Sequence, residues 1–337
     1  MKKRWIIWIS IAAFVWVVLS RFAEIQEVAE PLGEGEWQWI LVAAFLQIAY
    51  YVIFTAVFKA AFHTVEVQSR IRELLPVTLG TLFVNTLAPT WGMAGAALFV
   101  DDVAHRGQSA ARAAAGTLLA QAADYVTFSL VMAFGLVYLL LNHDLKAYEL
   151  VGAAFMLLVI FGLGGGLVLA VWRPDWLIQL FGLAQQGING LMIKLKRRTR
   201  LTGDWAGQNA GEFIEAANAI KARPRRLLKT LSIALGAHMI NIISLYAIFL
   251  AFHQQIGVWA LVAGYAMGIL FWDISPVPQG IGIVEGVMAL LFTTLGVPTL
   301  TATVIALAFR ALDFWLPMVL GFILLRKVKI FGSAKRP

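Results

Sequence analysis

Apolar residues along the 337-residue chain gather into long runs separated by short polar stretches. A helix needs ~20 apolar residues to cross the hydrocarbon core of a membrane, and most of these runs are long enough. The pattern therefore predicts an all-α polytopic membrane protein. The runs lie at about 5–20, 37–62, 74–100, 110–141, 150–172, 227–252, 258–295 and 299–325.

Helix breakers interrupt two of these runs. Proline and glycine are tolerated at membrane depth only where the freed backbone groups are buried in protein or line a wet cavity. Each broken run is therefore either one kinked span or a re-entrant hairpin of two half-helices, and each break is a candidate binding site. The breakers are Pro89, Gly92 and Gly95 in the first run, and Pro278, Gly280 and Gly282 in the second.

The positions of the basic residues decide between these topologies, because cytoplasmic loops carry an excess of Lys and Arg. If both broken runs are re-entrant, 63–73, 101–112, 173–229 and both termini face the cytoplasm, and only Arg21 and Lys146 face outward. Every other arrangement exports either the 173–229 loop or the basic tail. We therefore expect about six spanning helices plus two re-entrant broken-helix hairpins.

An internal repeat relates the two broken regions. Pro278 lies 189 residues after Pro89, and the same offset separates Gly107 from Gly296 and Asp124 from Asp313. We predict a single membrane domain over 1–337, with repeat one at 37–141 and repeat two at 227–326. One span separates the repeats, so they should be inverted, as in secondary transporters. The alternative is an old duplication retained for packing.

Two segments lie outside this repeat. Residues 1–20 carry basic residues before an apolar run and no clean cleavage site, which indicates an uncleaved signal anchor. Residues 173–226 form a cytoplasmic basic amphipathic segment, in which apolar positions recur at helical spacing. That segment would lie on an anionic leaflet or serve only as a topology determinant packed on the bundle. The apolar positions are Leu177, Leu180, Phe181, Ala184, Ile188, Leu191 and Leu195.

Composition narrows the function classes. The chain is 60% hydrophobic and 14% charged and has no cysteine, which excludes disulfides and thiolate metal sites. Its net charge of +8 is concentrated at membrane boundaries, so the expected partner is an anionic leaflet and not nucleic acid. No nucleophile–base pair, zinc motif or phosphate loop is present. We expect no enzymatic activity, no cofactor and no bound metal.

Two carboxylates and one guanidinium inside predicted spans are candidates for chemistry. Asp124 and Asp313 lie near the bilayer centre, where a carboxylate is costly and marks a functional candidate. Arg310 should pair with Asp313 one turn away, or reach across to Asp124. Its repeat partner is Gln121, so the positive charge is not duplicated. The alternative is a buried ion pair that only fixes helix register.

The second half-helices, which begin just after Gly95 and Gly282, offer N-terminal amides as anion sites. Glu285 lies in the first turn after Gly282, either as a favourable helix charge or as a gate or proton carrier. Other polar residues near the breaks have simpler interpretations. Asp273 and Asn85 should cap loosened backbone, and His238 and Asn241 should hydrogen-bond between helices.

These residues carry a resemblance. The P-V-P-Q-G-I-G-I-V-E-G run, the R-A-L-D of 310–313, and the earlier P-T-W-G and Q-A-A-D resemble the lysylphosphatidylglycerol synthase transmembrane family, over roughly 37–326. The chain departs from the family pattern after Pro89, where a basic residue and a Gly-Glu pair are expected, and at Gln121, where an Arg is usual. No synthetase region is found, so we expect that this chain does not make the lipid itself.

The resemblance implies translocation of a phospholipid or another polar-headed lipid between leaflets. The substrate-binding set would comprise the two breaks together with Gln121, Asp124, Glu285, Arg310 and Asp313. Such proteins lie in the prokaryotic inner membrane, here with both termini cytoplasmic and as a possible homo-oligomer. Two alternatives remain: a non-transporting lipid-binding partner of a lipid- or glycan-modifying enzyme, and a carrier of small ions.

Overall fold

The structure is a computed structural model that describes residues 35–87, 93–142, 168–194, 204–275 and 277–325, with Gly33, Ala154 and 165–166 besides. This part of the chain is helical throughout and holds no strand, as predicted. Four helical stretches in it are long and apolar enough to cross a membrane. They are α3 (Trp37–Thr64), α6 (Ala110–Asn142), α10 (Pro224–Ala251), and the continuous stretch of α13 (Thr299–Arg310), η2 (Ala311–Trp315) and α14 (Leu316–Leu325).

The predicted signal anchor at 1–20, most of the predicted span at 150–172 and the basic tail after 325 lie outside the described residues. The number of spans therefore stays a prediction. The four spans are sufficient to identify a helical membrane protein, because each presents a continuous apolar surface of membrane length.

Both broken runs form pairs of short helices. The first gives α4 (Ile71–Leu87) and α5 (Met93–His105), and the second gives α11 (Val258–Ile274), the short turn η1 (Pro278–Gly280) and α12 (Ile283–Thr294). These helices are 12 to 17 residues long, too short to cross a membrane alone. The second break coincides with the predicted Pro/Gly segment, whereas Pro89 and Gly92 lie outside the described residues. Re-entrant placement of the hairpins in a bilayer stays a prediction.

Helix bounds reproduce the internal repeat with one refinement. Adding 187 to the bounds of α3 and α4 gives the bounds of α10 and α11. After the breaks the offset is 189, as the first residues of α6 and α13 show. Gly107 and Gly296, which also differ by 189, both adopt left-handed backbone just before these helices, with φ of 75° and 96°. The second broken segment is therefore two residues longer than the first.

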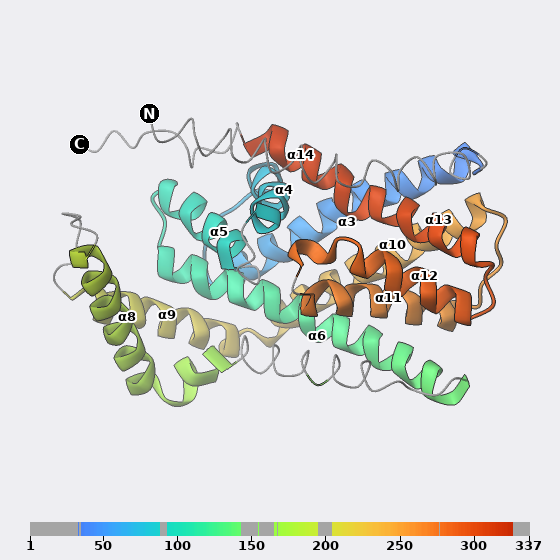
Figure 1. Ribbon diagram of the computed structural model, residues 1–337. Coiled ribbons are helices and arrows are strands. Elements are labelled where there is room, and N and C mark those ends of the chain that lie inside the picture. The colour runs from blue at the N-terminus through green and yellow to red at the C-terminus, as the bar shows by residue number, and fades with distance from the viewer. Residues whose placement is uncertain are drawn as a thin grey trace.

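Equivalent helices of the two halves run antiparallel. The Glu36 amide at the start of α3 donates to the carbonyl of Ala251 at the end of α10 (2.9 Å). At the opposite end, Arg223 before α10 donates to the carbonyl of Thr64, the last residue of α3 (3.0 Å). The halves are therefore inverted with respect to each other, and α3 and α10 pass side by side through the middle of the bundle (Figure 1).

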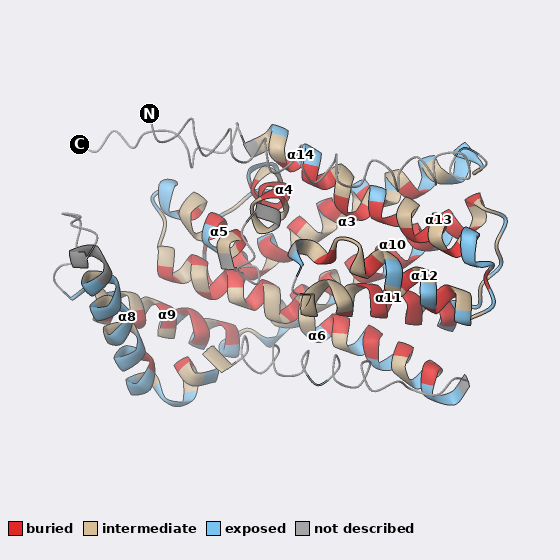
Figure 2. Ribbon diagram, viewed as in Figure 1, coloured by how far each residue is buried: buried red, intermediate tan, exposed pale blue. Residues whose placement is uncertain are grey.

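The hairpins enter the bundle from opposite ends (Figure 1). Glu73 of α4 pairs with Arg106, just beyond α5, at one end (2.8 Å). Trp259 of α11 packs on Phe134, towards the far end of α6. The second tip reaches the first hairpin, because η1 contacts α4 and Ile281 packs against the buried cluster that contains Phe83 of α4. The second break consequently lies in the interior beside α4, where buried residues dominate the helices (Figure 2).

Basic residues gather at the end where α3 finishes and α10 begins. Arg106 and Arg112 form ion pairs there with Glu73 and Glu215, at 2.8 and 2.9 Å. Arg223 donates a hydrogen bond to Glu66 and thereby lowers the pKa of that exposed carboxyl. At the opposite end, the described connections 252–257 and 295–298 contain no Lys or Arg. This polarity favours the predicted orientation, with the basic end in the cytoplasm.

Helices α8 (Pro174–Lys194) and α9 (Trp205–Ala222) form an extension at the basic end (Figure 1). The predicted helix in this segment is present as α8, but its apolar positions divide between two faces. Leu177 and Phe181 pack inward with Phe213 of α9. Residues of the other face remain uncovered, with 64% exposure for Trp176, 57% for Leu180 and 67% for Leu183.

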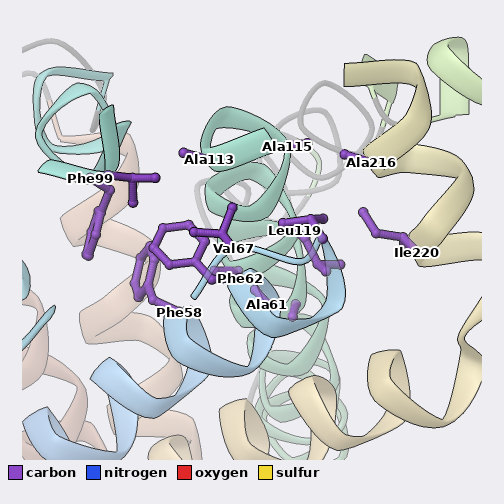
Figure 3. Packing of buried hydrophobic residues seen from close by; sticks show 14 of the residues in the cluster. Phe58, Ala61, Phe62, Val67, Phe99, Ala113, Ala115, Leu119, Ala216 and Ile220 are labelled. Carbon is purple, nitrogen blue, oxygen red and sulfur yellow. The ribbon is translucent and has the colours of Figure 1, made fainter. Parts of the chain in front are cut away.

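The core at the basic end joins α3, α5, α6 and α9 (Figure 3). Phe58 of α3 stacks on Phe99 of α5 with ring centroids 4.0 Å apart. Alanines, among them Ala61, Ala113 and Ala216, let the helix backbones approach closely, as is usual in membrane bundles. This packing holds the first hairpin and α9 against the two long helices.

Gly321 lies at a close approach between the halves. A Cβ atom built on Gly321 of α14 would lie only 2.2 Å from the carbonyl oxygen of Leu79 in α4. Backbone cannot yield as a flexible side chain does, so any larger residue must push α14 away from α4.

We therefore expect Gly321→Val to destabilise the folded protein by about 1–3 kcal/mol through overpacking. The measurement is the thermal unfolding temperature in detergent. Gly236→Ala in α10 is the matched control, because nothing lies within 4 Å of its added Cβ. Equal unfolding temperatures for the two variants would contradict the close α4–α14 contact.

Candidate functional site

Arg310 is the most deeply buried charged side chain in the described residues, at 1% exposure. It ends α13 and points into the tip of the second hairpin. Its Nε donates to Glu285 Oε1 (3.1 Å) and its Nη2 donates to the carbonyl of Gln279 (2.9 Å). The rings of Trp272 and Phe314 lie 5.0 and 4.7 Å from the guanidinium carbon. Hydrogen bonds and aromatic faces together offset the large cost of burying this charge.

Glu285 lies in the first turn of α12, where a carboxylate favours the helix N-terminus. Its Oε2 accepts from the Gly282 amide (2.7 Å), while its Oε1 accepts from Arg310. Sequence reasoning identified the amides after Gly282 and the Arg310 guanidinium as anion sites. In the structure the carboxylate of Glu285 takes a bond from each.

The tip of the second hairpin, at 279–282, contains left-handed backbone conformations that few residues other than glycine adopt. Gly280 and Gly282 have φ of 65° and 83°, and Gln279 is left-handed as well at 57°. A Cβ on Gly280 would lie 2.5 Å from Val284 Cγ2 and 3.3 Å from the Cα of Trp272. Pro278 begins the turn. This conformation aims the Gln279 carbonyl at Arg310, so the helix break forms part of the site.

Asp313 lies three residues after Arg310 on η2, a π-helical turn. Its Oδ1 accepts from Gln47 Nε2 (2.9 Å) and from Asn241 Nδ2 (3.1 Å), and its Oδ2 lies 3.8 Å from Arg310 Nη1. The Tyr51 hydroxyl donates to the Asp313 backbone carbonyl. Asp313 therefore links α3 and α10, the two crossing helices, to the Arg310 cluster. Asn241 bonds between helices as predicted.

Gln47 and Tyr51 are the residues that sequence reasoning missed. Gln47 is the only polar side chain between Gln38 and Tyr50, and it is fully buried. A lone amide in an apolar span is itself a signal, because hydrocarbon gives it no partner. The Tyr51 hydroxyl gave no comparable signal, since tyrosine is common in membrane helices.

Asp124 belongs to a second cluster, which corrects one expectation. Its Oδ1 lies 3.3 Å from His238 Nε2, and His238 Nδ1 lies 2.9 Å from the Tyr265 hydroxyl. The described polar contacts of Arg310 include Asp313 but not Asp124. Of the two expected alternatives for Arg310, the structure shows the contact with Asp313 and not the reach to Asp124, because the guanidinium turns towards the hairpin tip.

The two clusters are related by the repeat. His238 lies 187 residues after Tyr51, and Asp313 lies 189 after Asp124. Tyr51 contacts the backbone carbonyl of Asp313, and His238 lies 3.3 Å from the backbone carbonyl of Asp124. Tyr51 of α3 therefore contacts the turn η2 that carries Asp313, and His238 of α10 contacts α6, which carries Asp124. In each case a residue of one half contacts the helix of the other half that carries the carboxylate.

The remaining predicted residues have structural contacts. Asn85 Oδ1 accepts from the Gly95 amide (2.9 Å) and caps α5, as expected. Asp273 was expected to cap backbone as well, but it accepts from the Tyr125 hydroxyl (3.3 Å). Gln121 is half-buried one turn before Asp124 and is not among the described contacts of Arg310. Pro89 and Gly92 lie outside the described residues.

The arrangement can hold an anion or move a proton. Within the described part of the chain, no three His, Asp or Glu side chains gather in a way that could hold a metal ion. What the halves do bring together is one guanidinium, two carboxylates, a helix N-terminus and two amide side chains, nearly all out of contact with the surface. Polar groups at this depth are retained where they bind, carry or gate something.

Removal of the Arg310 charge should leave Glu285 and Asp313 uncompensated. We expect Arg310→Leu to destabilise the protein by about 3–5 kcal/mol. Adding Glu285→Gln to Arg310→Leu should recover part of that loss, because one buried charge disappears. Denaturant unfolding in detergent measures both. Arg225→Leu, on the exposed start of α10, should change stability by less than about 0.5 kcal/mol. A double variant less stable than Arg310→Leu would contradict the assigned pairing.

Comparison with known proteins places this chain in a family. A family model described as "Lysylphosphatidylglycerol synthase TM region" matches residues 5–321. A "UPF0104 membrane protein" of Pyrococcus horikoshii is 24% identical, over 97% of both chains. One of Methanothermobacter thermautotrophicus is 21% identical over 91% of this chain and 90% of its own length. A third, of Methanocaldococcus jannaschii, is 20% identical over 95% and 94%.

The relatives' names state a membrane location and no activity. The family match covers nearly the whole chain, including both broken hairpins and the Arg310 cluster. The protein therefore belongs to the family defined by the transmembrane region of lysylphosphatidylglycerol synthase.

Proposed function

We propose that this protein is a lipid transporter of the flippase type and not an enzyme. The observation that carries the proposal is the Arg310 cluster, a buried anion-binding group located where the two inverted halves meet at the tip of the second hairpin. Inverted halves with broken helices suit alternating exposure of a midplane site to the two sides of a membrane. Membership of a family named after a lipid synthase supports a lipid as the cargo.

The site is chemically suited to a phosphate-bearing headgroup. Arg310 and the Gly282 amide already bind a carboxylate, that of Glu285, and a phosphate oxygen presents the same acceptor to both donors. Glu285 would then be an internal stand-in that the headgroup displaces. Because Glu285 is 12% exposed and Arg310 only 1%, the headgroup would meet Glu285 first.

The outward face of α8 supports contact with one leaflet. Trp176, Leu180 and Leu183 are exposed together at the basic end of the bundle. Apolar residues next to a basic surface are typical of helices that lie in the headgroup region of an anionic leaflet. On this proposal the basic end faces the cytoplasm, and α8 lies along the inner leaflet of the plasma membrane.

The test is exchange of a fluorescent phosphatidylglycerol between leaflets of proteoliposomes. We expect exchange above that of empty vesicles. Arg310→Lys should slow it about tenfold, because an ammonium cannot make both of the guanidinium's bonds and one charge-assisted hydrogen bond is worth ~1.5 kcal/mol. Arg225→Lys is the matched control and should exchange at the wild-type rate.

Folded protein that binds the lipid without any exchange would overturn the transporter proposal. That result would favour the alternative of a membrane partner that presents a lipid to an enzyme. Equal rates for Arg310→Lys and Arg225→Lys would place the path away from the buried cluster.

A further inference from the structure

The buried cluster has a charge imbalance. It contains one guanidinium, Arg310, and two carboxylates, Glu285 and Asp313, with side-chain exposures of 1%, 12% and 2%. With all three ionised, the net charge is −1. An uncompensated charge at this depth costs several kcal/mol. Something must supply the missing positive charge.

Arg310 hydrogen-bonds to Glu285, whereas its contact with Asp313 is a longer ion pair. Both oxygens of Glu285 accept hydrogen bonds, from Arg310 Nε and from the Gly282 amide. Arg310 Nη1 lies 3.8 Å from Asp313 Oδ2, beyond hydrogen-bonding distance, and has no other partner. Asp313 Oδ1 receives only the neutral amides of Gln47 and Asn241. The excess negative charge therefore belongs to Asp313.

Unpartnered atoms around Asp313 show what is missing. Asp313 Oδ2, Gln47 Oε1 and Asn241 Oδ1 are all buried and have no hydrogen-bond partner. All three are acceptors, and all belong to the groups that meet at the Asp313 carboxylate. Buried polar atoms are nearly always paired, and the unpartnered donor beside Asp313, Arg310 Nη1, lies beyond hydrogen-bonding distance, so the three acceptors together indicate an absent donor. A proton on Oδ2 would turn one of these acceptors into that donor and cancel the excess charge at the same time.

The other titratable groups near Asp313 supply no positive charge. Tyr50 and Tyr51 of α3 and Tyr265 of α11 interact with it, and all three are neutral phenols at ordinary pH. Asn241, its contact on α10, does not ionise. The histidine nearest to this region, His238, is paired with Asp124 in the other cluster. Only a proton on Asp313 itself, or an ion from outside, can balance the site.

Asp313 also lies on a backbone feature that its repeat partner lacks. Residues 311–315 form a π-helical turn, whereas α6 runs as regular α-helix through Asp124. Such turns inside helices are frequent at functional sites. Here α13 ends at Arg310 and the π-helical turn begins at the next residue. The Asp313 carbonyl in this turn accepts a hydrogen bond from Tyr51 of the opposite half. A change at Asp313 can thus be transmitted to α3.

We propose that Asp313 binds and releases one proton in each transport cycle, so that movement of an anionic lipid headgroup is coupled to movement of a proton. This proposal rests on the transport function above. A phosphate bound at Arg310 would add a further negative charge to the cluster, so headgroup binding favours protonation of Asp313. By linkage, protonation favours headgroup binding to the same extent. The proton comes from water on the side that the site faces and leaves to water on the other side.

Infrared spectroscopy tests proton binding without any transport. Difference spectra of the purified protein between acidic and alkaline buffer should show the C=O stretching band of a buried protonated carboxyl. Asp313→Asn should remove the band, and Asp313→Glu should restore it at a shifted frequency. Asp124→Asn should retain it, because Asp124 is paired with His238 and 26% exposed. A band that persists in Asp313→Asn, or no band in the wild type, would overturn the proposal.

Proteoliposomes with a pH gradient and a clamped membrane potential test the coupling. For one proton per lipid, a gradient of one pH unit should sustain up to about a tenfold ratio of labelled phosphatidylglycerol between leaflets. Asp313→Asn, an isosteric mimic of the protonated acid, should equilibrate the lipid without responding to the gradient. Exchange in the wild type that ignores the gradient would refute coupling while the transport function stands. Absence of exchange together with the infrared band would refute the transport function while proton binding stands.

Discussion

The structure depends on how one buried guanidinium is shared. Arg310 is held by the tip of the second hairpin through Glu285 and Gln279, and it lies on the same helical stretch as Asp313, which holds the two crossing helices. A cation at this depth is stable only while those partners stay in place. The cluster therefore joins hairpin, crossing helices and second repeat into one unit that cannot change in one part alone.

The same constraint explains why the break in the second hairpin is useful. A continuous helix would direct its carbonyls along its own axis and leave none for Arg310. The left-handed backbone at Gln279 and Gly280 turns one carbonyl inward and starts a new helix whose first turn carries Glu285. The strained backbone at this break thus supports the burial of the Arg310 charge. In membrane proteins, broken helices occur where the freed backbone groups are buried in protein or serve a site.

Much of the backbone arrangement could be predicted from the sequence. Proline and glycine mark breaks directly, and the spacing of Pro89, Gly107 and Asp124 recurs with Pro278, Gly296 and Asp313 without any knowledge of contacts. Side-chain partners could not be predicted in the same way. Arg310 was assigned to a carboxylate on its own helix or on α6, whereas its shortest bonds go to a turn that reaches it only after the hairpin folds back.

Other parts of the site left weak signals or none. Gln47 stands alone in an apolar run and could have been singled out, but nothing in the sequence shows that it and Asn241 share one oxygen of Asp313. The π-helical turn has no sequence pattern of its own. The two-residue difference between the halves was hidden because both Pro276 and Pro278 are available to match Pro89.

That length difference separates this protein from an ideal inverted repeat. Two identical halves exchanging conformations would give two end states that are related by a two-fold rotation in the membrane plane and equal in energy across a symmetric bilayer. Here the second broken segment is two residues longer, and the Glu285–Arg310 ion pair belongs to the second half. In the proposed transport cycle the two end states then differ intrinsically in energy, so one of them is the resting state.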